Sequence, residues 1–474
     1  MLFNSYAFIC LFLPLTFLGY FLCHRLGRPV AGKAWLLVAS LFFYSWWNVA
    51  YLPILLASIL VNYFLAYFML RQNEARPAGQ GGWNARRWLF LASMAFNLGL
   101  LGYFKYRDFF VGNVNLACGT DFSLLHLALP LGISFFTLQQ VAFQVDVYEG
   151  LTQENRFLDY AVFVSFFPQL IAGPIVHHME VIPQFEQMAN SRVDARNVAE
   201  GLCLFSIGLF KKVVLADTFA LWASQGFDHA PSLGALGAWC ASLSYTFQLY
   251  FDFSGYTDMA LGAGLLFNIR IPKNFQSPYK ARNIVNFWRQ WHITLSNFIT
   301  TYVYTPMVKL TGRRISFAKS MAAMFAAMFI SGLWHGAAWT FVVWGALHGV
   351  ALVSCHVFRK KKLKMPKTLA WFLTFLFVNA SFVIFRATNW HDAFKVLRGM
   401  AGLGQAAAGT VNWLMLPSLA VAFGLVLLGR PSTDMVAGTA LATRRAYVWY
   451  GLLACAALTV LEIRKASEFL YFQF

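Results

Sequence analysis

The sequence predicts an all-α polytopic membrane protein with about 11–13 transmembrane or re-entrant helices. Two features support this prediction. Of the 474 residues, 59% are hydrophobic and only 12% are charged, whereas soluble domains carry about a quarter charged residues. Apolar windows close to the roughly 20 residues that span a bilayer also recur along the chain, for example at Tyr6–Cys23, Trp35–Ala50, Tyr51–Leu70 and Met415–Leu428.

Basic residues gather in short clusters between the apolar runs and indicate how the chain is oriented. In a soluble protein a net charge of +18 would suggest nucleic acid, but here the clusters follow the positive-inside rule, so we expect no nucleic-acid partner. The first apolar run has no basic residue before it, and we expect a membrane span there, not a cleaved signal peptide. The clusters expected on the cytoplasmic side are His24–Lys33, Arg71–Arg87, Lys309–Lys319 and Arg359–Lys367.

The chain has no recognisable linker or soluble domain, so we predict one integral-membrane domain over residues 1–474. It is expected to turn at Trp46–Pro53, where Trp46 and Trp47 suit a membrane interface. The polar stretch Gln184–Glu200 fits either an amphipathic surface helix or a loop. From about residue 245 to 350, Gly, Pro, Asp, Arg and His interrupt the apolar runs. Irregular backbone at membrane depth is tolerated only inside protein or beside a water-filled cavity, so this block is the predicted functional centre.

The stretch SGLWHGAAWTFVVWGALHG begins at Ser331 and places titratable rings in an apolar run. Because the basic clusters on either side are both expected in the cytoplasm, this segment must cross the bilayer and return. His335 would then lie inside the hydrocarbon core, where an ionisable residue is functional by default, and the alternative is a packing role. His348 lies off the face of His335 on the returning helix, and we predict a structural role for it.

A basic and aromatic segment, NFWRQWHITLSNFITTYVYTP, follows Lys280. Arg289 and His292 are three residues apart and would share one face of a helix, with Trp288 and Trp291 beside them. This pattern predicts an entry site for an anionic donor at the cytoplasmic interface, with His292 deeper and facing a cavity. The alternative for Arg289 is a snorkelling anchor.

The stretch QLYFDFSGYTDMALGAG carries two carboxylates, Asp252 and Asp258. Six residues place them about 240° apart around a helix, so they are poor candidates for an acid–base pair. We expect the Ser-Gly pair between them to break the helix and Asp258 to cap it or to pair inside the bundle. Tyr256 and Asp258 are therefore predicted as supporting residues.

The stretch FFPQLIAGPIVHHME contains Pro168 and Pro174, which should kink or interrupt the span. His177 and His178 are adjacent and would point about 100° apart on a helix, so they could not bind one metal ion from it. No HExxH spacing occurs elsewhere, and we predict no metal in the site.

The motifs WRQWHITLS, YFDFSGYTDMALG, FFPQLIAGPI and SGLWHGAAWTFVVWGALHG together resemble the membrane-bound O-acyltransferase (MBOAT) superfamily, in particular its bacterial alginate and cellulose O-acetylation branch. The start MLFNSYAFICLFLPL and the ending FLYFQF fit as well, so the resemblance covers essentially the whole chain. It implies helices ringed around a thinned centre with a central tunnel. The family's invariant histidine falls on His335 and its second characteristic position on His292. One departure is TTYVYTPMVKLTGRR, where the alginate branch usually reads RDYLYIPLGGNR.

The resemblance further implies a membrane O-acetyltransferase of the bacterial inner membrane. It would take acetyl from a cytoplasmic thioester, acetyl-CoA, as a substrate and not as a bound cofactor. It would deliver the group for O-acetylation of an exopolysaccharide, alginate or cellulose. Its expected partners, besides the lipid bilayer, are periplasmic or membrane-anchored acetyltransferases and a polysaccharide synthase complex.

As a mechanistic hypothesis, His335 is the general base, because imidazole titrates near neutral pH. His292 orients the thioester or steadies the oxyanion. Trp334 supports the pair. Direct transfer and a covalent acyl-enzyme both stay open. Two other classes also stay open: a transporter or acyl channel, and a non-catalytic scaffold subunit of an exopolysaccharide modification complex. The residues predicted to hold the donor at the cytoplasmic mouth are Arg289, Lys280, Trp288 and Trp291.

Overall fold

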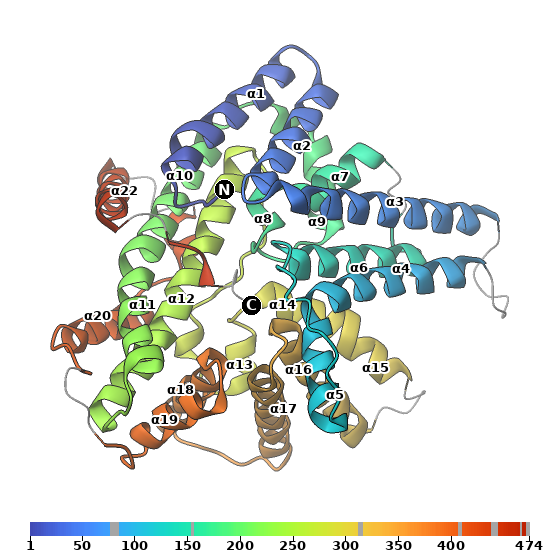
Figure 1. Ribbon diagram of the computed structural model, residues 1–474. Coiled ribbons are helices and arrows are strands. Elements are labelled where there is room, and N and C mark those ends of the chain that lie inside the picture. Colours follow the sequence, from blue (N-terminus) through green and yellow to red (C-terminus); the bar gives the residue numbers. More distant parts are fainter. Residues whose placement is uncertain are drawn as a thin grey trace. The chain divides into compact units, whose positions relative to one another are not determined.

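The computed structural model describes residues 1–75, 85–152, 156–310, 316–405, 410–437, 444–464 and 467–470, and every regular element in these ranges is a helix (Figure 1). Parts of two predicted basic clusters, residues 76–84 and 311–315, lie outside the described residues, as does the end of the FLYFQF motif. The described chain forms two compact units. The prediction of one membrane domain over the whole chain stays a prediction.

Unit 1 comprises Met1–Phe205 and Met259–Pro272. Its main helices are α1 (Leu13–Arg25), α2 (Pro29–Ser45), α3 (Leu52–Ala75), α4 (Ala85–Leu101), α5 (Arg107–Cys118), α6 (Ile133–Glu149), α7 (Phe157–Ser165), α8 (Phe167–Leu170) and α9 (His178–Glu186).

Unit 2 comprises Ser206–Asp258 and Lys273–Phe474. Two helices, α10 (Ala195–Phe210) and α12 (Ala235–Leu266), have residues in both units. The other main helices of unit 2 are α11 (Asp217–Ser224), α13 (Ile284–Trp288), α14 (Ile293–Phe298), α15 (Thr305–Leu310), α16 (Phe317–His335), α17 (Trp339–Lys360), α18 (Lys367–Arg386), α19 (Trp390–Met400), α20 (Met415–Leu428), α21 (Ser432–Val436) and α22 (Arg444–Arg464).

Within the described ranges, six helices are long and apolar enough to cross a membrane, and this confirms the prediction of an all-α polytopic membrane protein. The first, Ala7–Arg25, shows why the composition is so apolar. Its exposed face is a stripe of leucines at helical spacing, Leu11, Leu15, Leu18 and Leu22, each more than half exposed. In water such a stripe would be unfavourable, whereas in lipid it is the expected surface. The other five are Val49–Gln72, Ala85–Cys118, Phe317–His335, Trp339–Lys360 and Lys367–Arg386, and shorter apolar helices cover Pro29–Ser45, Met415–Leu428 and Val448–Leu461.

The predicted turn between the second and third apolar runs is confirmed. α2 ends at Ser45 and α3 begins at Leu52, and the Asn48 side chain caps the turn between them by accepting a hydrogen bond from the Ala50 backbone amide. Trp46 and Trp47 are exposed there, as an interfacial pair should be.

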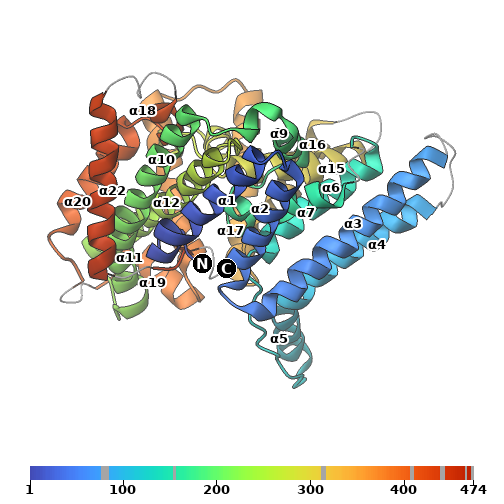
Figure 2. The ribbon, with the colours of Figure 1, turned by 90° about the horizontal axis from the view of Figure 1, so that it is seen from above.

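Buried amides join α3, α4 and α6, of which α3 and α4 run side by side in Figures 1 and 2. Asn62 and Asn97 exchange hydrogen bonds of 3.1 and 2.6 Å, and Gln144 donates to the Asn62 backbone carbonyl at 2.7 Å. Mutual pairing is how polar groups in an apolar bundle are tolerated, because an unpaired amide costs about 1–3 kcal/mol.

The expected interruption around Pro168 and Pro174 is confirmed. α7, α8 and α9 are separate short helices, and residues 171–177 between α8 and α9 are not helical. Gln184–Glu200 is neither one amphipathic helix nor one loop, because α9 ends at Glu186, a 3-10 helix covers Met188–Ser191 and α10 begins at Ala195.

The predicted break at Ser254-Gly255 is wrong, because α12 runs without interruption from Ala235 to Leu266. The glycine instead allows another backbone to approach closely: a Cβ at Gly255 would lie 2.8 Å from the Gly208 carbonyl oxygen. Close approach, and not helix breaking, is therefore the reason that this position has no side chain.

α16 and α17 form a helical hairpin, and their backbones approach each other closely where they cross. A Cβ on Gly332 would lie 2.5 Å from the Phe341 carbonyl oxygen, and one on Gly345 would lie 2.7 Å from the Met328 carbonyl oxygen. Small residues at such a crossing let two helices pack without a hydrophobic driving force. The crossing lies one turn before His335, so it fixes the position of that ring.

Candidate active site

His335 is the last residue of α16, and the chain reverses through Gly336–Ala338 before α17 begins. Its ring is 4% exposed and lies among aromatic rings, with centroid distances of 5.0 Å to Trp334, 5.1 Å to Trp344 and 5.3 Å to Phe385. These neighbours exclude water, so the ring stands in surroundings of low dielectric constant.

His292 connects α13 and α14 with its backbone in the left-handed region, at φ 45°. The expectation that Arg289 and His292 share a helix face is therefore wrong, because α13 ends at Trp288. His292 is fully buried, its ring lies 6.5 Å from that of His335, and Phe253 packs edge-on against it at 4.7 Å. Burial lowers the pKa of His292 to about 3, so this ring stays neutral at physiological pH.

Asn274 holds the left-handed turn in place. Its backbone carbonyl accepts a hydrogen bond from the Ile293 amide at 3.0 Å. Its side-chain oxygen lies 3.2 Å from His292 Nδ1 and accepts from the Thr294 amide and hydroxyl at 3.1 and 3.0 Å. Sequence analysis missed Asn274, although it lies in the irregular central block. Its only sequence signal is a polar residue in the loop before the histidine motif.

His348 has the structural role that its position suggested. Trp288 Nε1 donates to His348 Nδ1 at 3.2 Å, and His348 Nε2 lies 3.0 Å from the Ser381 hydroxyl. With Nδ1 accepting, the neutral ring carries its proton on Nε2 and donates to Ser381. His348 thereby links α13, α17 and α18. Trp288, predicted to hold the donor, is also a structural partner of this ring.

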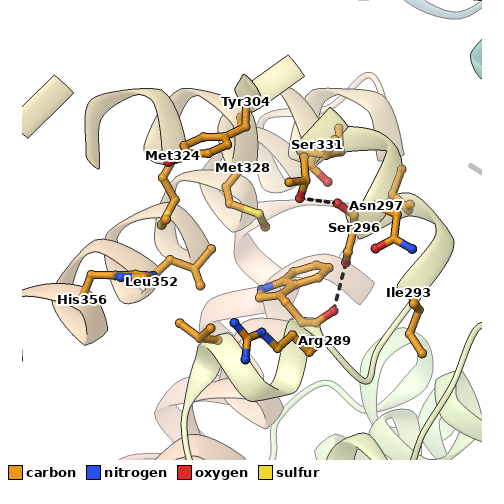
Figure 3. A pocket seen from close by; sticks show the side chains of 16 residues that line it. Arg289, Ile293, Ser296, Asn297, Tyr304, Met324, Met328, Ser331, Leu352 and His356 are labelled. Carbon is orange, nitrogen blue, oxygen red and sulfur yellow. Dashed lines mark hydrogen bonds between the residues drawn. The ribbon is translucent and has the colours of Figure 1, made fainter. Parts of the chain in front are cut away.

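A cavity of about 440 Å³ lies beside this centre (Figure 3). Trp288 and Arg289 line it, as does Ser331, one turn before His335. Ser296 lines it too, and its hydroxyl donates to the Trp288 carbonyl at 3.0 Å. Neither His335 nor His292 is among the lining residues, so the cavity adjoins the histidine pair and does not contain it. Met324, Met328 and Leu352 give the cavity an apolar wall.

Two other residues were predicted to hold the acyl donor, and the structure brings neither of them to this cavity. Lys280 Nζ donates to the Gly429 carbonyl at 2.6 Å. Trp291 is 2% exposed and packs between Phe275 and Phe382, with ring centroids 5.1 and 5.3 Å away. Because the helix ends before Arg289, Trp291 turns into the core and away from the cavity.

A basic entry was predicted at Arg289, but the contribution of α17 to it was not. His356 of α17 lines the cavity and lies within electrostatic range of both Arg289 and Arg359. Arg359 donates to the Asn283 side chain at 3.1 Å, so it ties the basic end of α17 to the start of α13. The sequence showed the basic run at Arg359, but not that His356 lies near both Arg359 and Arg289.

The supporting carboxylates neutralise buried lysines. Asp258 pairs with Lys211 at 2.7 Å, which confirms a pairing role, and Asp252 pairs with Lys212 at 2.7 Å. Because the two aspartates lie on different faces of α12, they hold different lysines and form no acid–base couple.

Residues 467–470 pack onto the same region of α12. Leu470 donates its backbone amide to Asp252 at 2.8 Å. Phe469 stacks on Tyr256 with centroids 4.5 Å apart and touches Phe253 at 5.6 Å. Phe253 is the ring that packs on His292, so these residues buttress the candidate site. Tyr256 belongs to this contact and is not among the residues lining the cavity.

In unit 1, Asp146, His177 and His178 each place one potential metal ligand within 4.8 Å of the others. The expected divergence of the two rings is wrong, because His177 precedes α9 with extended backbone and the rings lie 4.5 Å apart. His177 Nε2 is 2.6 Å from Asp146 Oδ2, whereas two ligands of one tetrahedral zinc ion lie about 3.3 Å apart. The spacing fits a hydrogen bond between histidine and aspartate. The absence of a metal from the site stays a prediction.

Residues 41–390 match the profile of the membrane-bound O-acyltransferase family, MBOAT. The chain belongs to this family. It is therefore an O-acyltransferase and a multi-pass membrane protein, as the motifs around His292 and His335 predicted.

Three similar proteins show where this O-acyltransferase stands in the family. It is 51% identical over 433 residues to a peptidoglycan O-acetyltransferase of Helicobacter pylori, covering 85% of this chain and 80% of the relative. It is 39% identical over 432 residues to a probable alginate O-acetylase of Azotobacter vinelandii, covering 89% and 82%. It is 28% identical over 277 residues to a teichoic acid D-alanyltransferase of Bacillus subtilis, covering 55% and 69%.

Proposed function

We propose that this O-acyltransferase takes acetyl groups from acetyl-CoA and passes them on for O-acetylation of peptidoglycan. The acceptor differs from the alginate or cellulose that the sequence suggested. The 51% identity to a peptidoglycan O-acetyltransferase favours peptidoglycan, since the alginate O-acetylase relative is 39% identical over a similar length. The observation that carries the proposal is the pair of buried histidine rings 6.5 Å apart, next to a cavity with a cationic edge.

The cavity is the proposed site of the donor. Arg289, with Arg359 and His356 near it, offers charge for the phosphates of coenzyme A, and arginine binds phosphate through paired hydrogen bonds. The apolar wall suits the uncharged arm that carries the thioester. Ser331 lies four residues before His335 on α16, so an acyl group entering along this wall approaches the histidine pair.

In the proposed reaction, a hydroxyl oxygen attacks the thioester carbonyl carbon and gives its proton to a ring nitrogen of His335. The carbon–sulfur bond then breaks, and the leaving thiolate takes a proton from the imidazolium. Positioned base catalysis of this kind contributes about 10²- to 10⁴-fold. The ring lies among Trp334, Trp344 and Phe385, and its neutral form is the one that can accept the proton.

We place the chain in the bacterial inner membrane, working with a periplasmic or membrane-anchored acetyltransferase partner. Acetyl-CoA is made inside the cell and peptidoglycan lies outside the membrane. A membrane enzyme that brings the acetyl group to the outer side, and a partner that transfers it to the polymer, would connect the two.

Mass spectrometry of cell-envelope polymers from a deletion strain tests this function. We expect acetylated muropeptides to disappear and to return when the wild-type chain is supplied, but not when His335→Ala is supplied at an equal membrane level. Unchanged muropeptide acetylation in the deletion strain would refute the peptidoglycan proposal, and loss of acetyl from an exopolysaccharide instead would assign alginate or cellulose. Full complementation by His335→Ala would favour a scaffold.

A further inference from the structure

Two donors of Thr294, its backbone amide and its hydroxyl, converge on the Asn274 side-chain oxygen and fix the orientation of that side chain. The Thr294 backbone amide lies 3.1 Å from Oδ1. A backbone N–H can only donate, so the atom that receives it is the amide oxygen and not the nitrogen. The usual ambiguity between the two atoms of an asparagine amide is thereby removed.

The orientation of Asn274 determines the proton position on His292. Its Oδ1 is an acceptor only, and His292 Nδ1 lies 3.2 Å from it. The hydrogen bond therefore requires a proton on Nδ1. Burial keeps the ring neutral, with a pKa of about 3, and a neutral imidazole has one proton. Nε2 must then carry the lone pair.

We infer that Asn274 is a positioning residue that holds His292 as its Nδ1–H tautomer, so that His292 accepts a hydrogen bond at the reacting groups and does not donate one. This inference rests on the proposed function for the identity of those groups. It changes the role expected for His292. A neutral ring whose Nε2 is unprotonated cannot stabilise an oxyanion at that nitrogen, because an oxyanion needs a hydrogen-bond donor. It can accept a hydrogen bond from another N–H or O–H of the bound substrates, while His335, whose ring lies 6.5 Å away, takes the proton of the attacking hydroxyl.

The backbone supports this assignment. A left-handed residue other than glycine costs about 1–2 kcal/mol, so its neighbours must hold it. Asn274 bonds to three successive residues, His292, Ile293 and Thr294. The same contacts that permit the turn therefore also set the tautomer.

Nitrogen NMR of the full chain in lipid bilayers, with ¹⁵N-labelled histidine, tests the tautomer without requiring activity. The His292 signals are identified by their loss in His292→Gln. We expect a protonated, pyrrole-type Nδ1 and an unprotonated, pyridine-type Nε2. In Thr294→Val, which keeps the backbone donor to Asn274, the pattern should be unchanged. In Asn274→Ala it should change to a mixture or to the opposite tautomer. A protonated Nε2 in the wild-type chain would overturn the inference.

Kinetics separate this inference from the proposed function. Asn274→Asp keeps the acceptor and adds a negative charge, which favours the protonated ring. The acid limb of the kcat/KM profile for acetyl-CoA should move up by about one pH unit or more. Asn274→Ala should lower kcat on the order of 10- to 100-fold with KM nearly unchanged. If the wild type turns over acetyl-CoA and Asn274→Asp has the same pH profile, the inference fails while the function stands. If the wild type has no activity, the function fails and the NMR result alone decides the tautomer.

Discussion

Substitution of Gly332 by alanine should displace His335 and His292 although it changes neither residue. A Cβ on Gly332 would lie 2.5 Å from the Phe341 carbonyl oxygen and 2.8 Å from the Gly345 Cα, about 0.9 Å short of ordinary contact at 3.4 Å for the closer atom. Both atoms belong to backbone and cannot rotate away. In Gly332→Ala, α16 and α17 must therefore separate by several tenths of an ångström or more, next to His335.

The expected effects are on both stability and rate. Overpacking of a close interface costs about 1–3 kcal/mol, and displacement of a reacting group by about 1 Å can cost 10²-fold in rate. We expect Gly332→Ala to have a lower melting temperature in detergent and to transfer acetyl about 10- to 100-fold more slowly. Gly345→Ala, on the facing helix, should behave in the same way.

The chain provides a matched control at Gly424, inside α20. A Cβ there meets nothing within 4 Å, so Gly424→Ala should keep both the melting temperature and the rate. The two measurements are thermal unfolding followed by size-exclusion chromatography and turnover of labelled acetyl-CoA in liposomes. If Gly332→Ala and Gly424→Ala had the same melting temperature and the same turnover rate, the close crossing of α16 and α17 would be refuted.

Three further predictions concern the surroundings of the site. Arg289→Gln should raise KM for acetyl-CoA about tenfold with kcat nearly unchanged, since a charged hydrogen bond contributes about 1.5–3 kcal/mol; no change relative to the exposed control Arg196→Gln would exclude Arg289 from the donor site. Phe469→Ala removes the ring that stacks on Tyr256 and packs against Phe253, so it should lower the melting temperature and kcat together, unlike exposed Phe110→Ala. Burial lowers the pKa of His292 from 6.5 to about 3, so between these values the unfolded chain binds a proton that the folded chain does not. Stability should fall as pH drops from about 6.5 toward 3, and less so in His292→Gln; equal slopes for both proteins would contradict the burial.

The sequence was sufficient to predict the fold class, and it singled out His292 and His335, whose rings the structure buries 6.5 Å apart. Apolar length identifies the spans because the bilayer sets it, and the windows Tyr6–Cys23 and Tyr51–Leu70 correspond to the helices Ala7–Arg25 and Val49–Gln72. An ionisable ring in such a run is conspicuous from composition alone, as His335 shows.

Tertiary contacts decided what the sequence could not. The helical spacing of Arg289 and His292 suggested a common face, but the hydrogen bonds that Asn274 accepts hold a turn at His292 and separate the two residues. Gly255 suggested a helix break, yet α12 continues through it, and the glycine instead makes room for the backbone at Gly208. Lys280 and Trp291 had the spacing expected of a donor site. Lys280 instead donates to the Gly429 carbonyl, far along the sequence, and Trp291 packs on Phe275 of the preceding loop.

The most direct test of the account is turnover of labelled acetyl-CoA by the purified chain in liposomes, compared between the wild type and His335→Ala. We predict a loss of about 10²-fold or more, with insertion and melting temperature as in the wild type. His391→Ala, at an exposed histidine, should keep full activity. A folded His335→Ala protein that transfers acetyl at the wild-type rate would contradict the role of His335 as the base.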